Sequence, residues 1–155
     1  MAKRETCTEM YDIDQVYNQD FFGPKRQNRK IEYYVLAKAI QQVWHFDSVI
    51  DLGCANGFTV EYWQLNPDQP ASIAHGIEGA QAAFEHMPPV IKSMIWHLDL
   101  REPLPVLGKY DLVTCMEVAE HLENQYAEQL VRNCVHLAKN QIHFTAATPE
   151  QPGEH

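Results

Sequence analysis

The sequence predicts an α/β domain with a doubly wound, mainly parallel sheet of about five strands and helices on both faces. Short apolar runs that suit buried strands alternate with segments of helical periodicity, and a turn of small residues, Gly53 to Gly57, joins the first run to a helix. Such alternation implies right-handed crossovers, which bring the carboxyl ends of the strands to one edge, where ligands bind. The 155 residues have room for one such domain.

Composition narrows the classes of function. The formal net charge of −9 disfavours a nucleic-acid partner held by bulk electrostatics. No apolar run reaches membrane-spanning length and the first residues lack the apolar region of a signal peptide, so we expect a cytoplasmic protein with no membrane partner. The four cysteines form no CxxC pair, which favours reduced, buried thiols over zinc ligands or disulfides.

Residues 1–27 are predicted to form an N-terminal arm, and residues 28–155 the core of the domain. The arm is expected to be irregular, with room for one short helix, because its polar and aromatic residues show no sustained period. We expect its aromatic residues to pack on the outside of the core; the alternative is a lid over a ligand. These residues are Tyr11, Tyr17, Phe21 and Phe22.

The core is predicted to begin with an amphipathic helix from Asn28 to Trp44. Its apolar positions recur with approximately helical spacing and should cover the sheet. They are Ile31, Tyr34, Val35, Ala39 and Val43. A basic run at the start of this helix, from Lys25 to Lys30, is predicted to be solvated rather than to bind a phosphate.

A short buried strand around Val49 to Leu52 then leads into the small-residue turn and a helix from Phe58 to Leu65. Because side chains are minimal at Gly53, Ala55 and Gly57, the backbone N–H groups of the turn can approach a ligand closely. The small residues are spaced one position tighter than in the GxGxxG of dinucleotide-binding turns. This spacing argues against a nicotinamide dinucleotide.

The next two strands carry an acid at their ends. The strand from Ser72 to Glu78 closes on Glu78 about twenty residues after the turn, where a carboxylate can accept both hydroxyls of a ribose. The alternative is a surface glutamate. After a short helix, Gln81 to His86, a third strand is predicted from Ser93 to Leu100. Its Asp99 is either a ligand contact or a turn-initiating aspartate.

A fourth, almost wholly apolar strand is predicted from Tyr110 to Met116. The segment Glu117 to Leu122 follows, then a helix that Asn140 is expected to end, and a fifth strand from Gln141 to Ala147. Four residues should meet at the shared carboxyl edge of the sheet: Gly53, Glu78, Asp99 and Glu117.

Four motifs in this order resemble class I S-adenosylmethionine (SAM) dependent methyltransferases, which have a Rossmann-like fold. They are DLGCANG at 51–57, with alanine in place of the middle glycine, HGIEGA at 75–80, HLDL at 97–100 and YDLVTCMEVAEHL at 110–122. The form EVAEHL is similar to that of small-molecule O-methyltransferases, including those of ubiquinone biosynthesis, and of RNA 2′-O-methyltransferases. The resemblance covers about Ser48 to Ala147.

The resemblance implies transfer of a methyl group from SAM to a small-molecule or sugar acceptor, on oxygen. It implies that Asp99 binds the adenine amino group, with Leu98 and Leu100 against the ring. Two alternatives stay open, an RNA 2′-O-methyltransferase and a non-catalytic SAM-binding module. The full predicted cofactor site is Asp51, Gly53, Cys54, Ala55, Asn56, Gly57, Glu78, Gly79, Leu98, Asp99, Leu100, Met116 and Glu117.

Glu117, Glu120 and His121 are the predicted catalytic residues. Their i, i+3, i+4 spacing places them on one face if the segment is helical. An oxygen acceptor must lose a proton, so we expect either His121 as a base or, as some resembling enzymes have, a divalent metal such as Mg²⁺. The favoured alternative to a metal is that Glu120 and His121 cap the next helix.

The resembling enzymes usually continue beyond the fifth strand into two more strands. This sequence stops at His155. We expect either a truncated chain or a homo-oligomer in which a partner completes the edge of the sheet.

Overall fold

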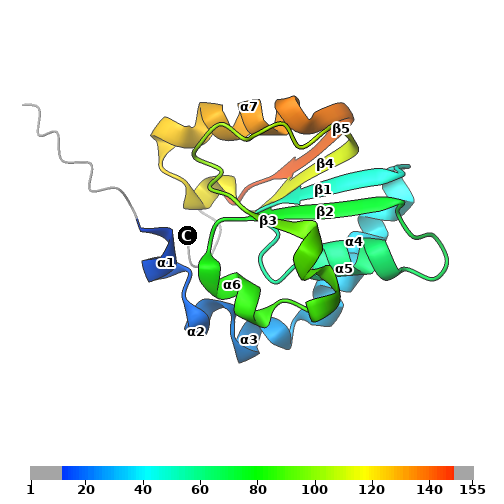
Figure 1. Ribbon diagram of the computed structural model, residues 1–155, viewed down its shortest axis with the longest axis horizontal. Coiled ribbons are helices and arrows are strands. Elements are labelled where there is room, and N and C mark those ends of the chain that lie inside the picture. Colours follow the sequence, from blue (N-terminus) through cyan, green and yellow to red (C-terminus); the bar gives the residue numbers. More distant parts are fainter. Residues whose placement is uncertain (1–11, 149–155) are drawn as a thin grey trace, which may run out of the picture.

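The computed structural model describes residues 12–148 and contains a five-stranded parallel sheet with strand order β3-β2-β1-β4-β5 (Figure 1). From β1 the chain moves outward through β2 and β3, then crosses to the other side of β1 and continues through β4 and β5. The order therefore reverses between β1 and β4, the place at which sheets of this type bind ligands. The predicted Rossmann-like α/β fold is confirmed.

The elements alternate as expected. The strands are β1 (Ser48–Leu52), β2 (Ile73–Glu78), β3 (Ile95–His97), β4 (Tyr110–Met116) and β5 (Ala138–Thr145). The α-helices are α1 (Ile13–Val16), α2 (Gln19–Phe22), α3 (Pro24–Gln27), α4 (Lys30–Val43), α5 (Phe58–Leu65), α6 (Gln81–His86) and α7 (Ala127–Leu137), and short 3₁₀ helices span Pro89–Met94, Ala119–His121 and Asn124–Tyr126.

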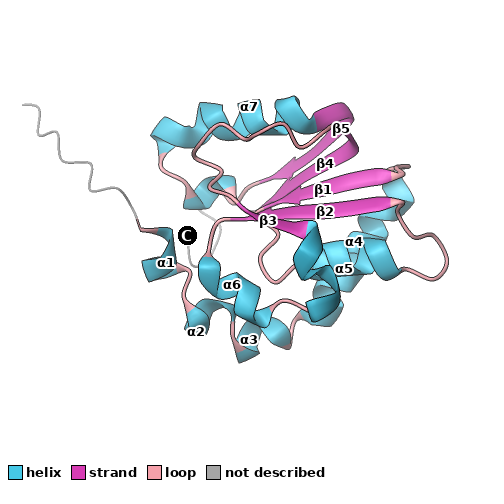
Figure 2. Ribbon diagram, in the orientation of Figure 1, coloured by secondary structure: helices cyan, strands magenta, loops and turns pink. Residues whose placement is uncertain are grey.

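Helices cover both faces of the sheet (Figure 2). α4, α5 and α6 lie on one face and α7 on the other. Successive residues of β1 point to opposite faces, so Val49 joins the cluster under α4 and α5 while Ile50 joins the cluster under α7. All five residues of β1 are buried, as expected for the central strand of a parallel sheet.

Several boundaries agree with the sequence prediction, and the third and fifth strands differ most from it. The structure has α5, α6 and β4 at the predicted residues. The third strand is shorter than predicted at both ends, because Ser93 and Met94 end a 3₁₀ helix and residues 98–100 belong to the loop after β3. Asn140 does not end a helix: β5 begins at Ala138, directly after α7, and a register shift opposite Asp111 accommodates an extra residue.

The predicted apolar face of the α4 helix is wrong. Ile31, Val35 and Val43 are 75%, 64% and 70% exposed. The helix instead buries Ala37, Ile40 and Gln41. The buried stripe is narrow because the Trp63 indole packs against small Ala37 and donates a hydrogen bond to its carbonyl oxygen. Gln41 can be buried because its amide donates to the Gln69 carbonyl oxygen.

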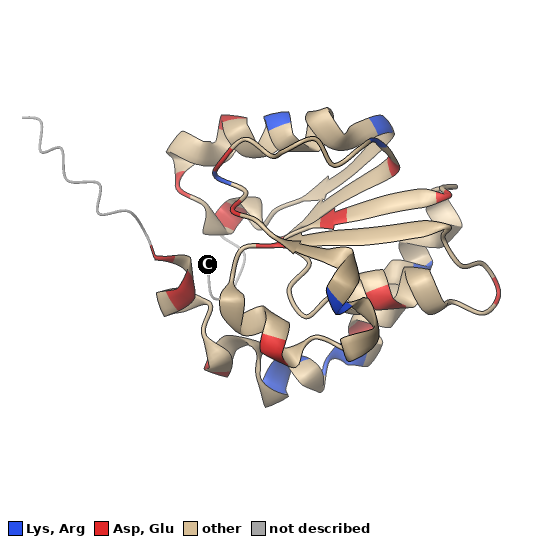
Figure 3. Ribbon diagram, viewed as in Figure 1, with Lys and Arg blue, Asp and Glu red and all other residues tan. Residues whose placement is uncertain are grey.

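The arm is more regular than predicted, since residues 12–27 form three short helices, α1 to α3. Tyr11 and Cys7 lie outside the described residues. Cys54, Cys115 and Cys134 are free and buried, as expected. Basic residues gather on α3 and the start of α4, while acidic residues occur on α1 and at strand ends (Figure 3). None of the helices within residues 12–148 is long and apolar enough to cross a bilayer.

Candidate functional site

A cavity of about 110 Å³ lies at the carboxyl ends of the strands. Gly53 after β1, Glu78 at the end of β2, Asp99 after β3 and Glu117 after β4 all line it. The structure thus brings together the four residues that the sequence predicted at one edge. Gly79 and Leu100 line the same cavity, and Leu98 lines a neighbouring hollow together with Asp99.

The turn after β1 forms the floor of this cavity. Gly53 has φ +73°, and a Cβ there would approach the Val118 side chain to 2.5 Å, so both conformation and space require glycine. Ala55, which replaces the middle glycine of the resembling motif, has φ +50°. It occupies the left-handed region that non-glycine residues rarely adopt.

Glu78 fixes the conformation of the turn. One carboxylate oxygen accepts a hydrogen bond from the Ala55 N–H (2.7 Å) and the other from the Ala80 N–H (2.9 Å). Burial raises the pKa of Glu78, and these backbone hydrogen bonds oppose that rise. Each oxygen keeps a further lone pair, so the carboxylate can also accept from a ligand.

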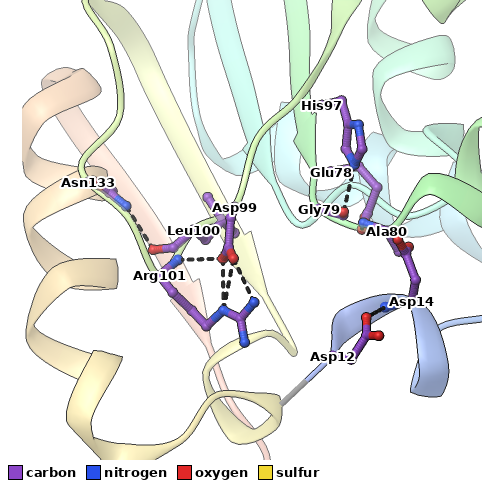
Figure 4. Close-up of polar contacts among 10 residues, drawn as sticks. All are labelled: Asp12, Asp14, Glu78, Gly79, Ala80, His97, Asp99, Leu100, Arg101 and Asn133. Atoms are coloured by element: carbon purple, nitrogen blue, oxygen red, sulfur yellow. Dashed lines mark hydrogen bonds and ion pairs between the residues drawn. The ribbon is translucent and has the colours of Figure 1, made fainter. Parts of the chain in front are cut away.

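The loop after β3 presents Asp99 to the cavity (Figure 4). The Asp99 carboxylate receives the Arg101 guanidinium, with the Arg101 Nη2 atom 2.7 Å from Asp99 Oδ2. The buried Asn133 amide of α7 donates to the carbonyl oxygens of Leu100 (2.9 Å) and Glu102 (3.0 Å). The described chain has no helix between β3 and β4, and these hydrogen bonds from Asn133 join the loop to α7.

The arm lines the opposite side of the cavity. Ile13, Tyr17 and Phe21 contribute to the wall, and the Tyr17 ring meets the His121 ring edge-on at 5.7 Å between centroids. These aromatic residues therefore border the cavity, as in the lid alternative, rather than only packing outside. Phe22 also lines the cavity, and it packs into the core as well.

The basic run from Lys25 to Lys30 was predicted to be solvated. The structure instead gives two of its residues, Arg26 and Lys30, contacts with other side chains. The Arg26 guanidinium lies 4.3 Å above the Phe21 ring centroid and lines the cavity. Lys30 pairs with the largely buried Glu61, at 2.7 Å between Nζ and Oε2. Aromatic residues followed by a basic helix start were a sequence signal that could have identified Arg26.

A second cavity of about 480 Å³ adjoins the first. The two cavities share wall residues from the arm, the turn and the segment after β4: Arg26, Gly53, Ala55, Glu117 and His121. The second also includes Glu120 and Met116, and its remaining polar wall comes from Arg29, Glu32, Tyr33, Asp51, Cys54 and Thr59. A ligand in the first cavity would therefore border a ligand in the second.

Glu117, Glu120 and His121 line the second cavity together, but not on one face of an α-helix. Glu117 has φ +53°, and only Ala119–His121 forms a 3₁₀ turn. The Glu117 carboxylate accepts a hydrogen bond from the Thr145 hydroxyl (2.8 Å). Among residues 12–148, no group of three or more His, Cys, Asp or Glu side chains is placed to hold a metal ion.

Four predicted site residues in or beside the turn do not line the first cavity, although Asp51 and Cys54 line the second. Asp51 is buried and accepts hydrogen bonds from Thr59 (2.5 Å) and Thr114 (2.7 Å), and burial raises its pKa to about 6. Burial likewise raises the pKa of the Cys54 thiol. Asn56 donates to the Phe22 carbonyl oxygen, and Gly57 precedes α5 in the left-handed region. Asn56 and Gly57 line neither cavity.

Comparison with known proteins shows the fold of class I SAM-dependent methyltransferases. The chain is 29% identical to the ubiquinone biosynthesis O-methyltransferase of Serratia proteamaculans (strain 568) over 106 residues, which are 65% of this chain and 42% of that protein. It therefore spans less than half of this curated relative. The chain matches no protein-family model.

Solved structures agree on the fold. DesVI of Streptomyces venezuelae superposes with a TM-score of 0.64 at 16% identity, covering 93% of this chain and 62% of DesVI. The plantazolicin methyltransferase BpumL, crystallised with a monoazolic desmethylPZN analog and SAH, superposes with a TM-score of 0.56 at 17% identity, covering 84% of this chain and 49% of BpumL.

Proposed function

We propose that the protein is a SAM-dependent methyltransferase that acts on an oxygen of a small-molecule or sugar acceptor. The observation that carries the proposal is the shared cavity of Gly53, Glu78 and Asp99 where the strand order reverses. The fold and the name of the curated relative support it. Glu78 is proposed to accept the ribose hydroxyls and Asp99 the adenine amino group, while Gly53 leaves room for the cofactor.

Arg26 and the arm are proposed to complete the cofactor site. The Arg26 side chain lines both cavities. We propose that its guanidinium binds a carboxylate, such as that of the methionine part of SAM. Tyr17 and Phe21 would shield the cofactor from water. We accordingly propose residues 1–27 as an arm of the site and residues 28–155 as the core that binds SAM.

Methyl transfer from a sulfonium is an in-line displacement that depends mainly on the alignment of donor and acceptor. The two adjoining cavities are proposed to hold the donor and the acceptor in this alignment. The sulfonium methyl group would point from the first cavity into the second. His121 lines both cavities and is proposed to accept the proton of the attacking hydroxyl. Calorimetry with Mg²⁺, Mn²⁺ and Zn²⁺ in the presence of SAM tests the metal alternative, which predicts binding.

The test is thermal unfolding with SAM and with its demethylated product, S-adenosylhomocysteine (SAH), followed by transfer of radiolabelled methyl groups to metabolite extracts and to RNA. Both ligands should raise the melting temperature, because they bind only the folded state. An unchanged melting temperature at saturating ligand would contradict the proposal. Ligand binding without any transfer would leave the non-catalytic SAM-binding module, and label on RNA would favour the 2′-O-methyltransferase.

The strand β5 forms one edge of the sheet. We propose that a second copy of the chain covers this edge, which a homodimer mass in light scattering would support. A monomer at high protein concentration would contradict it.

A further inference from the structure

The Asp99 carboxylate is held by a residue of its own loop, Arg101. The Arg101 backbone N–H donates to Oδ1 (2.9 Å) and Nη2 donates to Oδ2 (2.7 Å), while Nε lies within hydrogen-bond distance of both oxygens, at 3.0 and 2.9 Å (Figure 4). A guanidinium that meets a carboxylate through two of its nitrogens fixes the direction of both groups and also attracts the charge. Arg101 therefore sets the orientation of Asp99.

The exposed fractions of the two side chains show which of them offers more surface to a ligand. The Arg101 side chain is 10% exposed, whereas that of Asp99 is 32% exposed. The Arg101 Cζ atom lies over the Tyr126 ring, 5.7 Å from its centroid, so the guanidinium has an aromatic contact in addition to Asp99. Asp99 thus keeps accessible surface at the first cavity, which it lines, while Arg101 is the more buried partner.

The number of donors leaves the Asp99 carboxylate one open acceptor position. A carboxylate can accept about four hydrogen bonds. Among the described residues, its hydrogen bonds all come from three N–H groups of Arg101. One remaining position suits a ligand group that directs a single N–H toward the carboxylate. An amino group on an aromatic ring is such a group, because its two hydrogens point in different directions.

We infer that Arg101 is a positioning residue for the recognition of adenine: it holds Asp99 so that the open acceptor position of the carboxylate meets the 6-amino group. The inference rests on the proposed binding of SAM and adds to it a residue that acts through Asp99. Without the guanidinium, the Asp99 side chain would keep only a backbone donor and could turn toward solvent. Binding would then have to immobilise this side chain, which lowers affinity.

The experiment compares the Kd of SAH with the Kd of an analogue in which hydrogen replaces the 6-amino group, both measured by titration calorimetry. The unaltered protein should bind SAH at least about tenfold more tightly than the analogue, the factor typical of one hydrogen bond to a charged group. Arg101→Met should lower this ratio to less than about threefold, because Asp99 is no longer held in place. A role confined to the stability of the loop would weaken both ligands equally and leave the ratio unchanged.

Two further variants accompany Arg101→Met. Arg132→Met makes the same change in an exposed ion pair with Glu128 on α7, and it should keep the ratio of the unaltered protein. Arg101→Lys keeps a positive charge beside Asp99 but lacks the planar fork of the guanidinium. It should therefore also lower the ratio, and it provides the test if Arg101→Met does not fold.

Equal Kd values for SAH and the analogue in the unaltered protein would overturn the inference, as would an unchanged ratio in a folded Arg101 variant. In both cases SAH binding would still support the proposed function. An unaltered protein that binds no SAH would refute the proposed function itself, and the inference with it.

Discussion

Glu78 accepts a hydrogen bond from the turn after β1, and we propose that it also binds the ribose. Replacing Glu78 with Ala should weaken SAM binding by about 1–3 kcal/mol, because charge-assisted hydrogen bonds to the ribose and to the Ala55 N–H are lost. Titration calorimetry gives the affinity. Glu85→Ala, an exposed acid on α6, is the matched control and should bind normally. Equal affinity in the two variants would mean that Glu78 does not bind the ribose.

Ala55 is the residue at which strain in the turn can be tested. Ala55→Gly should raise the free energy of unfolding by about 1 kcal/mol, because glycine adopts the positive φ without steric cost. Ala39→Gly makes the same chemical change on an exposed helical position and should lower stability by about 1 kcal/mol. Urea denaturation measures both, and a destabilised Ala55→Gly would show that the turn is not strained.

Two aspartates on the neighbouring strands β1 and β4 should have opposite effects on how the free energy of unfolding changes with pH. Burial raises the pKa of Asp51 on β1 to about 6, so its contribution lowers stability as pH rises from about 4 to about 6. A rise in pKa from about 4 to about 6 limits this effect to at most about 3 kcal/mol. Hydrogen bonds from Ser48, with Lys139 nearby, lower the pKa of Asp111 on β4 to about 2, so its stabilisation is lost as pH falls from about 4 to about 2.

Denaturation between pH 2 and pH 7 separates the two contributions. Asp51→Asn should flatten the curve between pH 4 and pH 6, and Asp111→Asn should flatten it below pH 4. If Asp51→Asn left the slope between pH 4 and pH 6 unchanged, the carboxylate would not be buried as described.

The loop after β3 depends on α7 through Asn133. Asn133→Asp should cost about 1–3 kcal/mol of stability, since a carboxylate would face the carbonyl oxygens of Leu100 and Glu102. It should also weaken SAH binding at temperatures where the variant is folded, because Asp99 shares this loop. Asn124→Asp, on an exposed turn, is the control and should change neither property. Unaltered SAH affinity in Asn133→Asp would show that the loop does not position the ligand.

The order of the helices and strands was predictable from the sequence, because each apolar run is bounded by turn residues. An acid or a glycine also stands at or just after the end of most strands. The convergence of Gly53, Glu78 and Asp99 followed from parallel topology alone. Side-chain packing was less predictable: the buried face of α4 depends on a polar Gln41 and on Trp63 reaching Ala37, which periodicity of apolar residues does not show. The periodicity of apolar residues also does not show the positive φ of Ala55, whose N–H donates to the Glu78 carboxylate.

We propose above that SAM binds in the cavity at which three strand ends meet. The most direct measurement is a crystal structure of the protein with SAH. We expect the adenine beside Asp99, both ribose hydroxyls within hydrogen-bond distance of Glu78, and the sulfur directed toward Glu120 and His121. Density for SAH at any other place on the protein would contradict it.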